Sequence, residues 1–227
     1  MTDQTEERAR VALVTGATSG IGRAVALKLA SDGFAVIVHG RDAERGAATV
    51  RAIEEAGGQA RFVGADLGNA DEVVRLAADA GEVDVLVNNG GFSWFGPTAE
   101  LDTATFDALF ASNVRSAYQL VAALAPGMAS RGRGSIISLD SMAGHVGLAG
   151  GAAYGATKAA LSVLTRSWAA EFSPSGVRVN TVAPGPVYSG ADAQRIEKLG
   201  TTTIFGRAAQ VEEIAEVIAF IASDKAS

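Results

Sequence analysis

Cysteine is absent from this 227-residue chain, so disulfides, thiolate metal sites and cysteine nucleophiles are all excluded. Histidine is scarce: its two copies, His39 and His145, lie far apart in the sequence, and we expect no metal site. No stretch approaches the roughly 20 apolar residues that a membrane span needs. The polar start MTDQTEERAR has no apolar signal core behind it. The expectation is a soluble, cytoplasmic protein.

An excess of positive charge is also missing, because the formal net charge is -6. Nucleic acids and anionic membranes attract basic surfaces, so neither is an expected partner. Aromatic residues make up only 6%, whereas 48% of the chain is hydrophobic and 27 residues are glycine. These apolar and small residues suffice for one sizeable core, and we expect a single domain over residues 1–227.

Short apolar runs alternate with longer helical patterns along almost the whole chain. Several runs are apolar throughout, as expected for strands covered by helices on both faces. The predicted strands are Val11–Thr15, Ala35–His39, Ala60–Ala65, Val83–Asn88, Ser135–Leu139 and Arg178–Val182. The predicted helices are Ile21–Ser31, Ala43–Ala56, Asp71–Ala80, Thr105–Ser130, Ala153–Phe172 and Val211–Ser223. This order predicts an α/β fold with a doubly wound, parallel, Rossmann-like sheet.

The first predicted strand runs into a glycine-rich turn, Thr15–Gly22, which a helix follows at once. Glycines let backbone N–H groups approach a pyrophosphate, and the N-terminus of a helix favours the anion. The spacing differs from the common G-x-G-x-x-G pattern, and the alternative is an ordinary tight turn. The interpretation we prefer is a dinucleotide-phosphate site.

The end of the second strand bears on which dinucleotide binds. NAD-binding folds usually carry an acidic residue there for the ribose 2′-hydroxyl. Here Gly40 takes that position and Arg41 follows it. A guanidinium can pair with a 2′-phosphate, which a carboxylate would repel, so NADP(H) is favoured over NAD(H). The alternative is that Arg41 is a solvated charge balanced by Asp42.

Tyr154 and Lys158 are four residues apart in a helical pattern, so they share one helix face. A protonated tyrosine can deliver a proton to a nascent alkoxide, and a nearby ammonium favours its ionised form. Ser141 follows a predicted strand at the end where doubly wound folds place their ligands. Its hydroxyl can hold a substrate oxygen, although Ser138 lies close by and either serine could simply satisfy a backbone group.

Taken together, these motifs resemble the short-chain dehydrogenase/reductase family, in its compact one-domain branch. The resemblance runs from Val11 to about Ser223 and covers nearly the whole chain. The residues that carry it, in order, are the turn Thr15–Gly22, Asp66 and Leu67, Asn88 to Gly91, Asn113, Ser141, Tyr154, Lys158, Pro184 and Gly185.

The resemblance implies a catalytic role for four residues. Tyr154 would be the proton donor or acceptor, and Ser141 would position the substrate oxygen. Lys158 would hold the nicotinamide ribose and lower the pKa of the tyrosine. Asn113 would help anchor a water in a proton relay, or it is only a helix residue bonded to backbone.

The same resemblance implies a set of cofactor contacts. Besides Tyr154 and Lys158, the expected cofactor-binding residues are Gly16, Thr18, Ser19, Gly20, Ile21, Gly22, Arg41, Asp66, Leu67, Asn88, Gly90, Pro184, Gly185, Val187 and Ser189. Of these, Asp66 and Leu67 would border the adenine.

Four features depart from the family pattern. Gly90 replaces the usual alanine, Asp140 stands where a second serine is common, and Ser189 replaces a frequent threonine. The fourth is that the sequence stops soon after the predicted helix Val211–Ser223. Family members usually continue into a last strand, so that strand is expected to be missing, which bears on quaternary structure more than on hydride chemistry.

The substrate is expected to be a small carbonyl or alcohol, bound by the loops after Ser141 and Pro184. The candidate pocket residues are Trp94, Phe95, Met142, His145, Leu148, Val187 and Tyr188, although each could simply serve packing. The segment Ser189–Phe205 resembles a mobile substrate lid.

The sequence therefore predicts an NADP(H)-dependent oxidoreductase that moves a hydride between the cofactor and a carbonyl or secondary alcohol. It is similar to β-ketoacyl carrier-protein reductases and related carbonyl reductases, and a homodimer or homotetramer is expected. The alternative from another class is a regulator that senses the nucleotide without turnover. That alternative is disfavoured because Tyr154 and Lys158 are both present.

Overall fold

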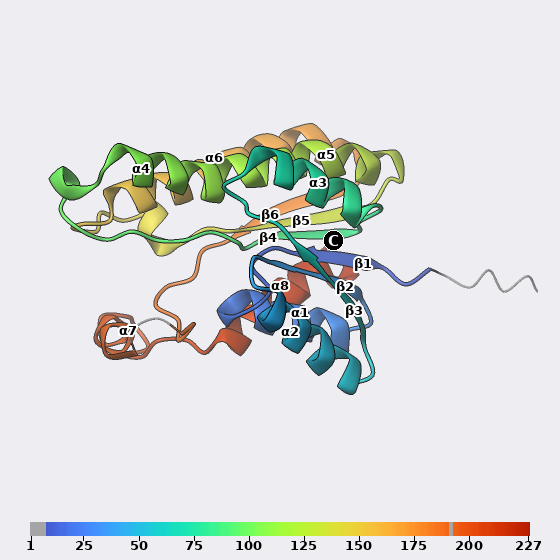
Figure 1. The fold of residues 1–227 in the computed structure, drawn as a ribbon, viewed down its shortest axis with the longest axis horizontal. Helices are drawn as coiled ribbons and strands as arrows, with labels where there is room; N and C mark the ends of the chain where they lie inside the picture. Colours follow the sequence, from blue (N-terminus) through green and yellow to red (C-terminus); the bar gives the residue numbers. More distant parts are fainter. Residues whose placement is uncertain (1–7, 191–192) are drawn as a thin grey trace, which may run out of the picture.

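The fold is known from a computed structural model, which describes residues 8–190 and 193–227. Its six strands are all parallel and form one sheet in the order β3-β2-β1-β4-β5-β6 (Figure 1). The strands are β1 Val11–Val14, β2 Ala35–Gly40, β3 Gln59–Gly64, β4 Val85–Asn88, β5 Gly134–Leu139 and β6 Val177–Val182. The predicted doubly wound Rossmann-like sheet is thereby confirmed.

Helices cover both faces of the sheet (Figure 1). One face carries α3 Ala70–Ala80, α4 Thr103–Phe110, α5 Ser116–Ser130 and α6 Ala152–Phe172. The other face carries α1 Gly20–Ser31, α2 Ala43–Glu55 and α8 Val211–Ala222. Among the described residues, none of these helices is both long and apolar enough to cross a membrane.

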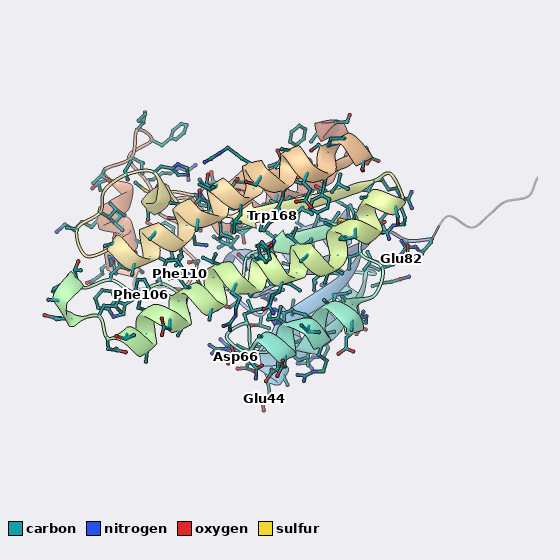
Figure 2. The ribbon with its side chains drawn as sticks, turned by 90° about the horizontal axis from the view of Figure 1, so that it is seen from above. Glu44, Asp66, Glu82, Phe106, Phe110 and Trp168 are labelled. Atoms are coloured by element: carbon teal, nitrogen blue, oxygen red, sulfur yellow. The ribbon has the colours of Figure 1, made fainter. Side chains whose placement is uncertain are left out.

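Two apolar cores fix the helices to the sheet. Val25 and Leu29 of α1 meet Ile218 of α8 under one face. On the other face, Leu120 of α5 and Trp168 of α6 belong to a second core. Figure 2 shows Trp168 between these two long helices. Because both faces are covered, strand residues such as Leu13 and Val14 are fully buried whichever way they point.

Parallel strands end at the same edge of the sheet, so the loops that follow them gather there. The order reverses between β1 and β4, which are neighbours in the sheet although β2 and β3 lie between them in sequence. In open α/β sheets, ligands bind at such a switch point, outside the carboxyl ends of the strands.

Two helical regions differ from the predicted helices. The expected single helix Thr105–Ser130 begins at Thr103, because Asp102 caps it by accepting a hydrogen bond from the Thr105 N–H at 2.8 Å. A π-turn at Ala111–Arg115 then interrupts it and separates α4 from α5. A further helix, α7 Ala193–Gly200, was not predicted at all.

Within the described residues, the sheet ends at β6. After α8 the chain forms a 3₁₀ turn, Asp224–Ala226. Arg178 of β6 binds the end of α8 by donating hydrogen bonds to the carbonyls of Ile221, Ala222 and Ser223.

Candidate active site

The turn between β1 and α1 packs so closely that its glycines leave no room for side chains. A Cβ atom on Gly22 would lie 2.3 Å from the carbonyl oxygen of Gly16. Ser19, at the N-cap of α1, makes no side-chain capping hydrogen bond. The first N–H groups of the helix have no intrahelical partner, so they remain available to an anion.

His39 of β2 holds this turn from below. Its Nδ1 accepts a hydrogen bond from the Gly16 N–H at 3.2 Å, and its Nε2 lies 3.1 Å from the carbonyl oxygen of Ala65. Accepting at Nδ1 requires the proton to be on Nε2, so the ring is neutral. Burial lowers the pKa of His39 to about 4, which keeps it neutral at physiological pH.

A cleft of about 760 Å³ opens beside the turn. Eleven of the predicted cofactor residues line it: Gly16, Thr18, Ser19, Gly20, Ile21, Gly22, Arg41, Asp66, Leu67, Gly90 and Ser189. These residues follow several different strands, and the fold brings them together as expected. An open cleft, a helix N-terminus and glycines without space for a Cβ fit a dinucleotide pyrophosphate.

Other residues that line the cleft were not predicted. They are His39, Gly40, Arg45, Ala65, Gly68, Asn89, Gly91, Phe92, Ala108 and Ser112. Arg45 could have been found from its sequence position, one helical turn after Arg41. Ala108 and Ser112 come from a distant helix, and nothing local in the sequence indicated them.

Asn88, which was predicted to line the cleft, is the last residue of β4 and is buried, whereas its neighbour Asn89 is among the residues that line the cleft. Asn89 lies past the strand and donates from its Nδ2 to the carbonyl oxygen of Thr15 at 2.8 Å. The Thr15 hydroxyl accepts from the Asn89 N–H in return, at 3.0 Å. These bonds tie the ends of β1 and β4 together at the switch point.

The remaining predicted cofactor contacts lie outside the walls of this cleft, at the ends of β5 and β6. Pro184 accepts a hydrogen bond from the Met142 N–H at 3.0 Å, so the loop after β6 lies against the loop that carries Ser141. Gly185 follows, and a Cβ there would lie 3.9 Å from Met142 Sδ. Val187 is buried and forms a parallel bridge with Ala209, and it is not among the residues that line the cleft.

Two elements bring Ser141, Tyr154 and Lys158 together. Ser141 begins the short turn Met142–Gly144 after β5, and its hydroxyl accepts from the Ala143 N–H at 3.2 Å. Tyr154 and Lys158 lie one turn apart on α6, and Lys158 Nζ is 5.8 Å from the centre of the tyrosine ring. The Ser141 hydroxyl lies close enough to the Tyr154 phenol to lower its pKa. Lys158 Nζ donates to the carbonyl oxygen of Leu139 at 2.6 Å.

The ionisation of this group differs from the expectation. Burial raises the pKa of Tyr154 above its ordinary value, the hydrogen bond from Ser141 lowers it, and the charge of Asp140 raises it. The net shift is thus upward, and Lys158 is not among its causes, whereas a lowering by Lys158 was expected. Burial lowers the pKa of Lys158 itself to about 8, with Asp140 opposing the change. At pH 7 the phenol is protonated and the lysine is mostly charged, as a proton donor and its supporting cation require.

Asn113 lies in the π-turn and bridges three elements. Its Nδ2 donates to the carbonyl oxygen of Phe92 at 2.9 Å and to the hydroxyl of Thr157 at 3.1 Å. Its Oδ1 accepts from the Phe92 N–H at 3.0 Å. The amide therefore fastens α6 and the loop after β4 to the interrupted helix. A part in the proton relay stays a prediction.

The predicted pocket residues surround the tyrosine only in part. The Phe95 ring lies 5.4 Å from that of Tyr154, and the guanidinium of Arg195 in α7 lies 4.4 Å from the Phe95 ring. Met142 and Leu148 are exposed at 38% and 37%. His145 is half exposed and bonds to Asp140.

Two further predicted pocket residues, Trp94 and Tyr188, make no ring contact with Tyr154 in the described part of the chain. Trp94 lines a separate cavity of about 290 Å³ with Leu101 and Phe106, the last of which is labelled at one end of the long helices in Figure 2. Tyr188 is half-buried and reaches Ala209 through its backbone.

A parallel Rossmann-like sheet with a glycine-lined cleft, together with a half-buried tyrosine one helical turn from a buried lysine, defines a dinucleotide-dependent oxidoreductase. Residues 10–200 match the family described as short chain dehydrogenase. The chain belongs to the short-chain dehydrogenase/reductase family, whose members are nicotinamide-dependent oxidoreductases acting on carbonyl or alcohol substrates.

Individual relatives agree with this assignment. The chain is 40% identical to a cis-4-hydroxycyclohexanecarboxylate dehydrogenase of Sinomonas cyclohexanicum, over 96% of this chain and 91% of that protein. It is 37% identical to a 3-oxoacyl-[acyl-carrier-protein] reductase of Staphylococcus aureus, over 95% of this chain and 91% of that protein. A metagenomic short-chain oxidoreductase solved in complex with NADP matches with a TM-score of 0.82 and 39% identity, over 96% and 92% of the two chains. The predicted family and reaction class are confirmed.

Proposed function

We propose that the chain reduces ketones to secondary alcohols, and catalyses the reverse oxidation, with Tyr154 as the general acid and base. The observation that carries this proposal is the proximity of Ser141, Tyr154 and Lys158 to one another, just after β5 and on α6, in a fold that also carries the glycine-lined cleft. When bound, the reduced nicotinamide supplies the hydride for the carbonyl carbon of the substrate.

The protein side of the reaction is proton delivery. Ser141 donates a hydrogen bond to the substrate carbonyl oxygen and orients it toward Tyr154. The phenol then donates its proton to this oxygen, so that a hydride and a proton together convert the ketone into the alcohol. General acid–base help of this kind is worth on the order of 10²–10⁴ in rate. Lys158, held by Leu139, keeps a positive charge behind the phenolate that forms.

Preference for NADP(H) over NAD(H) is part of the proposal, and Arg41 supports it. Arg41 is exposed at the cleft wall, and no carboxylate of the described residues pairs with it. Asp42, which was considered as its balancing charge, bonds instead to Arg45 at 2.8 Å. A carboxylate at position 40 is disfavoured as well, because a Cβ on Gly40 would lie 2.4 Å from Thr18 Cγ2.

The substrate class we favour carries an anionic group set apart from its reacting carbon. The Arg195 guanidinium lies 4.4 Å from the centre of the Phe95 ring, and the Phe95 and Tyr154 rings are 5.4 Å apart. Phe95 therefore lies between the cation and the phenol. A cyclic ketone with a carboxylate across the ring is a compound of this class. The relative named for cis-4-hydroxycyclohexanecarboxylate carries the corresponding hydroxy acid in its name.

A homodimer or homotetramer remains our proposal for the assembly. Apolar side chains are exposed on the outer helices, with Phe106, Tyr118 and Val163 on one face and Val217 and Phe220 on the other. Surfaces of this kind are common where copies of a chain meet. A cytoplasmic location and the absence of nucleic-acid or membrane partners also stay predictions.

The test is the substitution Tyr154→Phe, assayed by NADPH absorbance at 340 nm with a panel of ketones. We expect turnover to fall by about 10²-fold or more while the affinity for NADPH stays largely intact. Tyr118→Phe is the matched control, because Tyr118 is exposed on α5 and is not among the residues that line the cleft. Full activity in the Tyr154 variant would overturn the role of the phenol. Binding of NADPH without turnover of any ketone by the unsubstituted protein would favour a nucleotide sensor.

A further inference from the structure

A buried carboxylate lies next to the proposed catalytic serine, where the family pattern favours a second serine. Asp140 is the residue between the end of β5 and Ser141, and its side chain has no exposed surface. An ionised carboxylate in such a place needs partners, because burying an unpaired charge costs several kcal/mol. The surroundings of Asp140 show which partners it has.

The two oxygens of Asp140 have different tasks. Oδ1 accepts a hydrogen bond from the backbone N–H of Ser141 at 2.7 Å, which fixes the start of the loop that carries the serine hydroxyl. Oδ2 lies 2.7 Å from Nε2 of His145, whose side chain is 50% exposed. The imidazole therefore covers the carboxylate on its solvent side and reaches water itself.

The charge of Asp140 also acts on two titratable groups of α6. Lys158 donates to the carbonyl of Leu139, the residue before Asp140, and the carboxylate charge opposes the loss of its proton. The same charge raises the pKa of Tyr154. A Cβ on Gly144 would lie 2.8 Å from Asp140 Oδ1 and 2.9 Å from the Ala159 backbone nitrogen, so this loop packs directly on α6. His145, Tyr154 and Lys158 are thus the ionisable groups that face the carboxylate among the described residues.

We propose that Asp140 is a positioning residue: it holds Ser141 in place through the Ser141 N–H and sets a buried negative charge where the loop packs on α6, with His145 clamping it from the solvent side. The inference rests on the proposed reductase function. It adds two residues to that function: Asp140 and His145, which influence the ionisation of Tyr154 and Lys158 without being part of the serine, tyrosine and lysine group.

The decisive variant is Asp140→Asn, which keeps the shape and removes the charge. Because the charge raises the pKa of both Lys158 and Tyr154, its loss lowers both. The alkaline limb of the kcat/KM profile for ketone reduction should move to lower pH by about one unit or more. Asp84→Asn is the matched control: Asp84 is also buried, but it pairs with Arg8 and bonds to the Val11 N–H at the other end of β1. That variant should lose stability and keep the pH profile.

A second pair of variants tests the clamp. His145→Gln can still donate a hydrogen bond to Asp140 and should keep the profile close to that of the unsubstituted protein. His145→Ala cannot, and should shift the profile in the same direction as Asp140→Asn, by a smaller amount. Equal profiles for the glutamine and alanine variants would overturn the role of His145.

A readout without turnover separates this inference from the proposed function. Ionisation of tyrosine is followed by ultraviolet difference absorbance, and the Tyr154 contribution is identified by its loss in Tyr154→Phe. In Asp140→Asn, Tyr154 should ionise at lower pH even if no ketone is reduced. An unchanged ionisation, or activity lowered by one constant factor at every pH, would show that Asp140 is only structural and overturn the proposal.

Discussion

The nucleotide cleft and the substrate side of the site are built in opposite ways. The turn that forms one wall of the cleft consists largely of glycine and backbone, with atoms so close that a Cβ at Gly22 would overlap its neighbours. The substrate side consists of exposed side chains, such as Phe95 and Met142, on loops and on α7. A part shaped by backbone contacts tolerates little change, whereas exposed side chains can be exchanged without refolding. We therefore expect substitutions in the cleft to abolish binding and those on the substrate side to change specificity.

The largest effect is expected from Gly22→Ala. The new Cβ would lie 2.3 Å from Gly16 O and 2.4 Å from Asn89 Nδ2, so the turn must move. Overpacking of this kind lowers the stability of a folded protein by about 1–3 kcal/mol or more. The displaced backbone N–H groups would also no longer point at the cofactor phosphates. Thermal unfolding and fluorescence titration with NADPH measure the two losses.

Gly127→Ala is the control for that experiment. A Cβ on Gly127 of α5 meets only Arg131 Nη1, at 3.4 Å, and alanine favours the helix. Its stability should be unchanged or higher. Unaltered NADPH affinity in the Gly22 variant would contradict the conclusion that the turn cannot accommodate a Cβ at this position.

Arg41→Asp should give the next largest effect, by swinging preference from NADPH toward NADH. Charge-assisted hydrogen bonds are worth about 1.5–3 kcal/mol, so the kcat/KM ratio of the two cofactors should change by about 10- to 100-fold. Arg51→Asp makes the same charge change on an exposed position of α2 outside the cleft. An equal shift in both variants would mean that the overall charge, not Arg41, sets the preference.

A smaller and more selective effect is expected on the substrate side. Arg195→Ala should lower kcat/KM by about tenfold for 4-oxocyclohexanecarboxylate and leave its neutral methyl ester almost unaffected, as loss of one charged hydrogen bond predicts. Lys198→Ala, on the same helix, is the control. A similar loss with both substrates would show that Arg195 shapes the lid and does not bind an anion.

The last prediction concerns pH and His39, and it leaves the stability at neutral pH almost unchanged. Its pKa is about 4 in the folded protein, against 6.5 ordinarily, so the unfolded chain takes up this proton first as pH falls. Stability should decline between about pH 6.5 and 4, by at most about 3 kcal/mol from this residue. His39→Gln should flatten that part of the curve. Parallel curves for the two proteins, from thermal unfolding at each pH, would contradict this.

Much of the fold could be predicted from the sequence because its signals are local. Apolar runs marked all six strands, and the glycines of Thr15–Gly22 marked the turn that the structure places at the cleft. The helix α7 was missed although Ile196 and Leu199 repeat the apolar spacing of Ala193, because the small and polar residues around them suggested a lid.

The rest depends on contacts between distant parts of the chain. Asn88 and Asn89 are adjacent and chemically identical, and only the end of β4 decides which of them faces the cleft. The pKa of Tyr154 is governed by burial and by Asp140, neither of which the spacing to Lys158 reveals. The bond between Asp140 and His145 likewise became visible only in three dimensions.

The π-turn at Ala111–Arg115 gives the long helix one residue more than regular winding would hold. Each residue of an α-helix turns the chain by about 100°, so removing one here would straighten the rod and swing everything beyond it around the axis. Asn113 would then face away from Phe92, and the faces of α4 and α5 could not both keep their present neighbours. The extra residue thus sets the rotation of α4 relative to α5. With it, Asn113 faces Phe92 while both helices keep their present neighbours.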